Sequence, residues 1–134
     1  MGFDDRFRFS VHAVIPNAAG RVLLLRQTYG DRGWGLPGGS VEPGETITTA
    51  IVRECREEIG VDVSLGPLTG WYFHSAVQAQ VGVFRCDLPD DAEIVLSDEH
   101  DQFRWEVPQN LLGSQAIRVA AALRYSGELH TLAF

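Results

Sequence analysis

The sequence predicts an α/β fold of the α+β type, in which a mixed β-sheet lies between helical layers. Two segments, residues 47–59 and 111–125, have the spacing of apolar side chains that is typical of amphipathic helices. Short alternating or apolar runs before and between them are typical of strands. At 134 residues, we expect residues 1–134 to form one domain with a proper core.

The first two strands are expected near the start of the chain. Residues 7–13 alternate between apolar and polar side chains, as a half-buried strand does. Residues 17–20 (NAAG) are typical of a turn, and residues 21–26 (RVLLLR) then form a short apolar run. This order predicts two strands separated by a turn.

The first helix has clear start and stop signals. Pro43 and Gly44 indicate a turn, after which the Thr46 hydroxyl can cap the first helical turn. Gly60 suits a left-handed C-terminal cap. Cys55 lies on the apolar stripe, so we interpret it as a small buried side chain and not as a nucleophile. The stripe expected to face the core consists of Ile47, Ala50, Ile51, Cys55 and Ile59.

The second half of the chain is predicted to add strands and a second helix. Ser114 is a candidate cap for the regular part of the helix at 111–125. The segment after Gly127 stays ambiguous. The inward face of the helix is predicted to hold Ile117, Ala120, Ala121 and Leu123. Strands are expected at residues 63–65, 70–74, 80–86 and 103–105.

Three acidic residues crowd one face of the first helix. Glu54, Glu57 and Glu58 are spaced i, i+3 and i+4, which makes them neighbours on a helix. Like charges at that spacing repel each other, so the pattern favours a bound cation. Carboxylate oxygens suit Mg²⁺, and Mn²⁺ can substitute for it. The alternative is a solvated acidic face without a ligand.

Residues 34–39 (WGLPGG) come just before this helix and contain two adjacent glycines. Glycine lets a backbone approach a ligand or adopt positive φ, which other side chains oppose. The alternative is an ordinary tight turn that leads into the helix. Both interpretations are compatible with the residues.

Residues 39–61 together match the pattern G-x5-E-x7-R-E-U-x-E-E-x-G-U, where U is a bulky aliphatic residue. This pattern resembles the signature of the Nudix hydrolase family. Every fixed position matches, and Cys55 departs from the pattern by occupying one U position. The resemblance implies an α/β/α sandwich with a mixed β-sheet, and it extends beyond the motif through the order of strands and helices.

The family resemblance also implies roles for individual residues. Arg53 resembles the arginine that holds the glutamates in position by charge-assisted hydrogen bonds. Glu45 resembles a carboxylate that supports the metal ligands from outside. The implied metal ligands are the carbonyl of Gly38 and the carboxylates of Glu54, Glu57 and Glu58.

An additional acidic residue is expected on a later loop. Nudix enzymes frequently place a metal ligand or catalytic base there, and Glu99 in the segment 98–101 (DEHD) matches best. Glu99 competes with Glu54 for the role of base, while a solvated acidic loop is the alternative. The neighbouring His100 is predicted to be a surface histidine. Glu54, Glu57, Glu99 and Arg53 are therefore the catalytic candidates.

The resemblance implies Mg²⁺-dependent hydrolysis of the diphosphate linkage of a nucleoside diphosphate linked to a group X. The chain lacks marks of several subfamilies, and its short length favours a compact type that acts on a nucleoside triphosphate or a nucleotide sugar. Candidate substrate contacts are Arg26, Trp34 and His74. Other aromatic side chains that could stack on a base are Tyr29, Trp71, Tyr72 and Phe73.

Two other classes of function are alternatives to hydrolysis. The first is a nucleotide-sensing module that uses the Nudix fold without catalysis, although such modules usually lack some of the carboxylates that this chain keeps. The second is a Ca²⁺-binding structural protein, which is disfavoured because the chain has no EF-hand loop pattern.

The composition limits the kinds of partner that the protein can bind. The formal net charge of −7 disfavours binding to nucleic acid, and a bound cation would supply the positive charge that a phosphate substrate needs. No apolar run approaches membrane-spanning length, and no signal-peptide pattern follows Met1. We interpret Cys55 and Cys86 as reduced thiols and therefore expect a cytoplasmic enzyme. Its expected partner is a small nucleotide diphosphate substrate, and the sequence leaves open whether the protein forms a homodimer.

Overall fold

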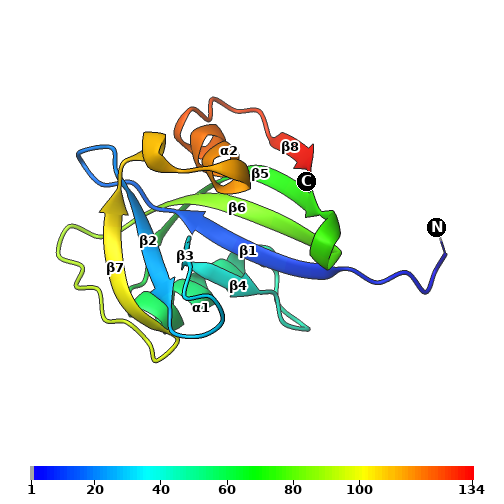
Figure 1. The fold of residues 1–134 in the computed structure, drawn as a ribbon, viewed down its shortest axis with the longest axis horizontal. Helices are drawn as coiled ribbons and strands as arrows, with labels where there is room; N and C mark the ends of the chain where they lie inside the picture. Colours follow the sequence, from blue (N-terminus) through cyan, green and yellow to red (C-terminus); the bar gives the residue numbers. More distant parts are fainter. Residues whose placement is uncertain (1) are drawn as a thin grey trace.

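Two β-sheets and two α-helices make up residues 2–134, the part of the chain that the computed structural model describes (Figure 1). The larger sheet has five strands in the order β4-β1-β6-β5-β8. β1 is parallel to β6 and β5 is parallel to β8, while the other neighbours are antiparallel, so the sheet is mixed as predicted. Its strands are β1 (Arg8–Val14), β4 (Gly38–Ser40), β5 (Ser64–His74), β6 (Ala79–Asp87) and β8 (His130–Ala133).

A smaller antiparallel sheet packs beside it in the order β3-β2-β7. The sequence did not indicate β3 or β4, since we expected only a loop or turn at residues 34–39. Strands of two and three residues are too short for a visible alternation pattern, and they form because β1 and β2 offer them partners. The strands of this sheet are β2 (Val22–Gln27), β3 (Trp34–Gly35) and β7 (His100–Glu106).

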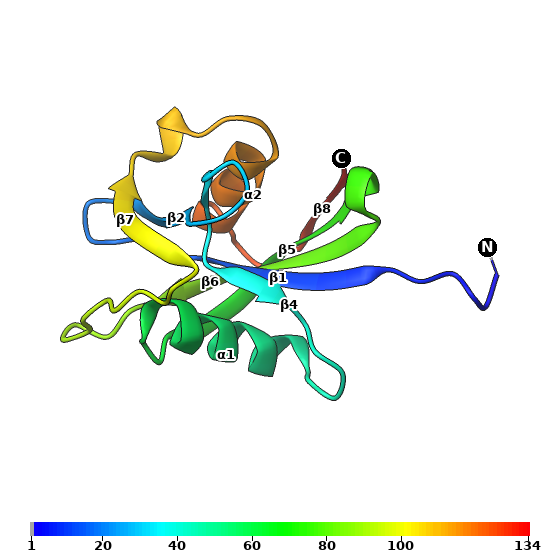
Figure 2. The ribbon, with the colours of Figure 1, turned by 60° about the horizontal axis from the view of Figure 1, so that its bottom comes forward.

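The two α-helices cover opposite faces of the larger sheet (Figure 2). α1 (Ile47–Ile59) packs through Ile51 and Cys55 on one core cluster, and α2 (Gly113–Leu123) packs through Val119 on a second. Because side chains alternate along a strand, Val11 belongs to the first cluster and Val14 to the second. The predicted α/β/α sandwich is therefore confirmed.

The ends of α1 follow the sequence signals. The Thr46 hydroxyl oxygen accepts the backbone N–H of Thr49 at 3.2 Å, and the Thr49 hydroxyl accepts the N–H of Thr46 at 3.0 Å. These two reciprocal bonds form a capping box, in which Thr replaces the usual Glu or Gln. Gly60 ends the helix with φ of 68° and donates its N–H to the carbonyl of Arg56 at 3.0 Å.

The prediction for α2 was partly wrong. The helix is shorter than residues 111–125, and its N-cap is Leu112, so Ser114 does not cap it. Ile117 and Ala120 are exposed, whereas Val119 and the pair at 121–122 are buried. The apolar stripe of this alanine-rich helix is broad, so the face that turns inward is decided by packing on the sheet and not by periodicity.

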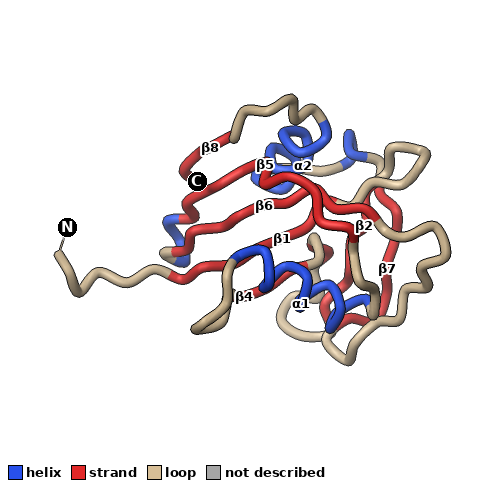
Figure 3. The backbone as a smooth tube through the Cα atoms, turned by 180° about the vertical axis from the view of Figure 1, so that it is seen from behind, coloured by secondary structure: helices blue, strands red, loops and turns tan. Residues whose placement is uncertain are grey.

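The strands of the second half are longer than predicted. Residues 63–65 and 70–74 belong to one strand, β5, because register shifts between Leu65, Leu68 and Gly70 let it pass Pro67 without losing its pairing to β6. β7 begins at His100 and thus three residues before the predicted segment. The ambiguous segment after Gly127 forms β8, which lies beside β5 at the sheet edge (Figure 3).

Short 3₁₀ turns complete the described elements. One covers Ser75–Val77 between β5 and β6, and the other covers Pro108–Asn110 before α2. Among residues 2–134, neither α-helix has the length and apolar character that a membrane span requires.

We expect Cys55→Val to lower the free energy of unfolding by less than about 1.5 kcal/mol, because the thiol is fully buried in the core beside α1 and valine is similar in size. Burial raises the pKa of the Cys55 thiol, which keeps it protonated and unreactive. Urea unfolding of both proteins measures the difference. A loss well above this value would show that the site cannot accept the branched valine side chain.

Candidate active site

The three glutamates of α1 have different surroundings despite their shared helix face. Glu58 is only 4% exposed, and the side chain of Glu54 is 13% exposed, since both turn toward β4. The side chain of Glu57 is 58% exposed and faces solvent. The helix thus presents two carboxylates to the interior and one at the surface.

Arg53 ties these acidic groups together. Its Nε and Nη2 atoms donate to the two carboxylate oxygens of Glu45 at 2.7 and 2.9 Å, a bidentate pair. Nη1 donates to Glu54 at 3.1 Å and to Glu57 at 3.2 Å, and Nη2 also donates to the carbonyl of Ser40 at 3.0 Å. The hydrogen bonds from Arg53 lower the pKa of Glu45 to about 2. Arg53 therefore holds three acidic side chains by charge-assisted hydrogen bonds.

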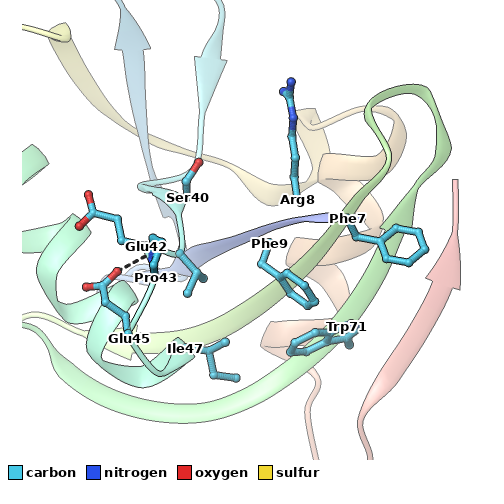
Figure 4. Close-up of a pocket in the computed structure, with 11 residues that line it drawn as sticks. Phe7, Arg8, Phe9, Ser40, Glu42, Pro43, Glu45, Ile47 and Trp71 are labelled. Atoms are coloured by element: carbon cyan, nitrogen blue, oxygen red, sulfur yellow. Dashed lines mark hydrogen bonds between the residues drawn. The ribbon is translucent and has the colours of Figure 1, made fainter. Parts of the chain in front are cut away.

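Glu45 is itself held by the loop before α1. The backbone N–H of Glu42 donates to Oε1 of Glu45 at 2.9 Å, shown by the dashed line in Figure 4. This loop borders an open groove of about 740 Å³. Figure 4 shows the side chains that line it, with the rings of Phe9 and Trp71 across from Glu42 and Glu45. Neither Glu54 nor Glu58 lines this groove, but Ser40 and Glu42 line both it and the carboxylate cleft, so the two adjoin.

The two glycines of β4 let the strand approach the carboxylates. The N–H of Gly38 donates to both oxygens of Glu58, at 3.2 and 3.3 Å. A Cβ on Gly39 would lie 2.5 Å from Oε1 of Glu54, and one on Gly38 would overlap the Val11 carbonyl oxygen. Only residues without side chains allow this close contact. Gly38 has the positive φ that the sequence suggested, at 151°, while a backbone approach to a ligand stays a prediction.

The carboxylates of Glu54 and Glu58 have too little positive charge around them, because Arg53 contacts Glu54 but not Glu58. Burial raises the pKa of Glu58 to about 8, and repulsion from Glu54, Glu99 and Glu57 adds to this effect while the Gly38 N–H opposes it. Burial also raises the pKa of Glu54, although Arg53 counteracts the shift. One guanidinium does not neutralise the group. A cation that binds here would relieve both burial and repulsion.

The loop before β7 brings Glu99 to the same site. Its backbone is fixed by Thr28, whose N–H donates to the Glu99 carbonyl and whose hydroxyl donates to the Asp98 carbonyl, both at 2.9 Å. Glu99 lines one cleft together with Glu54 and Glu58. The structure therefore brings this loop carboxylate and the helix carboxylates together.

His100 is not the surface histidine that the sequence predicted. Its side chain is 9% exposed, and its Nε2 lies 4.0 Å from Oε2 of Glu58. The charged segment 98–101 suggested a solvated loop, but β7 already begins at His100 and turns the imidazole inward. Burial lowers the pKa of His100, which favours the neutral ring.

The carboxylates line a cleft of about 310 Å³ that also receives residues from the other side of the sheet. Several of these were not predicted, because their roles depend on which strand face and helix face meet the cleft. His12 comes from β1, and Gln115 and Arg118 come from α2. Further lining residues are Leu25, Gln27, Tyr29, Gly35 and Leu36.

The three predicted substrate contacts are not among the residues that line the cleft. Arg26 forms a bidentate pair with Asp101 at 2.8 and 2.7 Å. The ring of Trp34 is covered by the guanidinium of Arg104 at 4.2 Å. His74 packs against the ring of Phe134 with centroids 4.9 Å apart. Arg26 lies between Leu25 and Gln27, which do line the cleft, so strand alternation turns its side chain away.

The donor atoms suit a hard divalent cation, since Glu54, Glu57 and Glu58 offer only carboxylate oxygens. Their present arrangement is not yet a coordination shell. Within residues 2–134, no three acidic, histidine or cysteine side chains are grouped closely enough to hold a metal ion. Glu57 is paired with Arg53 and Glu58 with the Gly38 N–H. Binding would therefore require Glu57 to turn away from Arg53.

Comparison with known proteins identifies the family of this fold and site. A family model described as the NUDIX domain matches residues 6–125. A nucleoside triphosphatase NudI from Escherichia fergusonii is 35% identical over 108 residues, which cover 67% of this chain and 76% of that protein. A MutT-like protein from Streptomyces ambofaciens is 36% identical over 88% of this chain and 78% of its own length. The crystal structure of an ADP-ribose pyrophosphatase from Streptococcus suis superimposes with a TM-score of 0.80 at 20% identity, covering 94% of this chain and 99% of that one.

Glu58 should make the cation-free protein less stable as the pH rises. The folded state keeps the Glu58 proton up to about pH 8, whereas an exposed glutamate releases it near 4.5, so folding becomes less favourable between these values. Glu58→Gln removes this effect. We expect its melting temperature to exceed that of the wild type by at least about 3 °C at pH 8.5, roughly 1 kcal/mol for a domain of this size, and to match it at pH 5.

Calorimetric melting in the presence of a chelator makes this comparison. A wild type that is as stable as Glu58→Gln at pH 8.5 would contradict the raised pKa of the buried carboxyl group.

Gly39→Ala should weaken divalent-cation binding by at least about tenfold, the scale seen when groups that support metal ligands are changed. The added Cβ would displace the Glu54 carboxylate. Gly35→Ala is the matched control, because a Cβ there meets nothing within 4 Å. Titration with Mn²⁺ followed by calorimetry gives the affinities of the wild type and the two variants. Equal affinities would show that cation binding does not require the packing of Glu54 on β4.

Proposed function

This chain belongs to the NUDIX family and is a Nudix-type pyrophosphohydrolase, and we propose that it hydrolyses the diphosphate linkage of a nucleoside diphosphate joined to another group X with Mg²⁺ as its cation. Nucleoside triphosphates and nucleotide sugars are the proposed substrates. The observation that carries this proposal is the group of carboxylates around Arg53, which is too acidic for a single guanidinium to balance.

The proposed ligands of the cation are the carboxylates of Glu54, Glu57 and Glu58 and the carbonyl of Gly38. When bound, the cation neutralises phosphate oxygens and stabilises the charge that develops during hydrolysis. Arg53 would keep Glu54 in place while Glu57 turns away from its present ion pair. The negative charge of the protein is then no obstacle to a phosphate substrate.

Hydrolysis requires a group that removes a proton from the attacking water. The water oxygen forms a new bond to one phosphorus while the bridging P–O bond breaks, and the departing phosphate keeps the electron pair. A carboxylate that faces the cleft can accept the proton. Glu54 and Glu99 are the two candidates, since Glu54 is held by Arg53 and Glu99 is exposed at the edge of the cleft.

The similarity to a nucleoside triphosphatase supports nucleoside triphosphates as the first substrates to test. The cleft supports a nucleotide as well, because carboxylates line one part of it, and Arg118 with neutral polar and apolar side chains lines another. A polyphosphate with its cation fits the first part, and a base with an apolar face fits the second.

The proposed compartment is the cytoplasm. Cys55 and Cys86 are both free and buried in the same core cluster, which supports a reducing environment.

The direct test is incubation of the protein and Mg²⁺ with a panel of nucleoside triphosphates and nucleotide sugars, followed by chromatography of the phosphate products. We expect cleavage within the diphosphate of at least one class, and none after addition of a chelator. Compounds that bind but are recovered intact would instead identify a nucleotide-sensing module without catalysis.

Glu57→Gln should lower kcat by at least about a hundredfold, the usual scale for the loss of one electrostatic contributor to the transition state. The variant should stay folded, since it relieves repulsion with its helical neighbours. Glu93→Gln, on an exposed loop, is the matched control and should stay within about threefold of the wild type. Near-normal turnover by Glu57→Gln would refute the role of the helix carboxylates.

Glu99→Gln decides between the two candidate bases. If Glu99 accepts the proton, kcat falls while the affinity for Mn²⁺ stays nearly unchanged. If kcat stays within about threefold of the wild type, Glu99 is only a solvated charge and Glu54 is the remaining candidate.

A further inference from the structure

α2 sends one arginine, Arg118, into the cleft that the carboxylates line. Its Nε atom is buried and has no hydrogen-bond partner, and among residues 2–134 no carboxylate forms an ion pair with its guanidinium. Arg26 and Arg53, in contrast, each hold a carboxylate in a bidentate pair. Arg118 is therefore a largely buried cation without a partner in the protein.

The groups around Arg118 offer it no negative charge. Burial, together with the nearby guanidinium, lowers the pKa of His12 to about 4 and also lowers the pKa of His74, so both rings are neutral at pH 7. Tyr72 is fully buried, and its hydroxyl is bonded to Nδ1 of His130 at 2.9 Å. Burial lowers the pKa of Arg118, yet an arginine side chain in a protein keeps its charge.

A buried charge without a partner lowers the stability of the protein. Buried charges are therefore usually paired within the protein or used to bind a ligand. Arg118 faces a cleft and not the closed core, which makes a bound molecule the available partner. Gln115 lies one turn earlier on α2 and lines the same cleft, while its Nε2 donates to the Trp34 carbonyl at 3.3 Å. Leu25 and Leu36 add apolar surface. This part of the cleft thus combines a planar donor with apolar walls.

We propose that Arg118 determines substrate specificity by donating hydrogen bonds to acceptor oxygens in a part of the substrate away from the hydrolysed diphosphate. This inference rests on the proposed function. The guanidinium is a planar fork that suits two adjacent acceptors. Such oxygens can come from a keto group on the base or from an outer phosphate, and the two sources are separated by the test below.

The first measurement is stability. Arg118→Met keeps an unbranched apolar stem and removes the guanidinium with its unpaired charge, so its melting temperature should be above that of the wild type. Arg124→Met is the matched control, because Arg124 is exposed at the C-cap of the same helix. A lower melting temperature for Arg118→Met would overturn the proposal, since it would show that Arg118 supports the fold.

The second measurement is nucleotide affinity with Mg²⁺ present, using GTP, ATP, UTP and CTP as analogues in which methylene groups replace the bridging oxygens between the phosphates, so that no turnover occurs. The pairs GTP and ATP, and UTP and CTP, differ in a keto or an amino group on the base, and GTP and GMP differ in phosphate number. We expect Arg118→Met to weaken binding by about tenfold or more for one group of ligands, as for the loss of a hydrogen bond to a charged group. Arg118→Lys should restore part of this loss by keeping the charge.

The pattern of losses identifies the oxygen. A loss confined to GTP, GMP and UTP, which carry the keto group, assigns that group, and an equal loss for all four triphosphates that spares GMP assigns an outer phosphate. Affinities that change by less than about threefold, or by the same factor for every ligand including GMP, overturn the proposal.

Turnover measured with Mg²⁺ separates this inference from the proposed function. If the wild type binds these nucleotides through Arg118 but leaves them intact, the proposed hydrolysis is refuted while the role of Arg118 stands. If the wild type and Arg118→Met hydrolyse these nucleotides equally fast, the role of Arg118 is refuted while the proposed function stands.

Discussion

The mutual repulsion of carboxylates around one guanidinium is the constraint on which the rest of the site depends. Arg53 binds Glu45, Glu54 and Glu57 at once, and no other arginine pairs with a carboxylate of α1 in residues 2–134. Glu58 is left with the backbone N–H of Gly38 as its hydrogen-bond donor, and its pKa rises as a result of burial. The helix is therefore built around a deficit of positive charge that a divalent cation can fill.

The fold makes this arrangement geometrically available. α1 is fixed at both ends by its caps, and the short strand β4 runs beside it because the glycines of that strand leave room for carboxylates. On the opposite face of the sheet, α2 supplies a cation of its own, Arg118, to the same cleft. The cleft thus has an acidic region from one helix and an isolated positive charge from the other. Under the proposed function, the acidic region with its cation would bind the hydrolysed diphosphate, and Arg118 would bind another part of the nucleotide.

Much of the α1 region could be predicted from sequence, and much of the α2 region could not. The signals in α1 are local: the spacing of Glu54, Glu57 and Glu58, and the caps at Thr46 and Gly60. Each depends only on neighbours along the chain, so the sequence predicts it directly. The inward face of α2 and the partners of Arg26 depend on which side chains meet after the sheet has formed. Arg118 lies in an alanine-rich helix with no local signal, and only its burial without a partner distinguishes it from other arginines.

The most direct test of the charge deficit is proton release on cation binding. Titration of the protein with Mn²⁺ at pH 7, in buffers of different ionisation enthalpy, measures the number of protons set free. Because the pKa of Glu58 is about 8, the carboxyl group is mostly protonated at pH 7, and its recruitment as a ligand should release close to one proton. The account predicts this release for the wild type and its loss in Glu58→Gln. Binding of Mn²⁺ without proton release, or no binding at all, would contradict it.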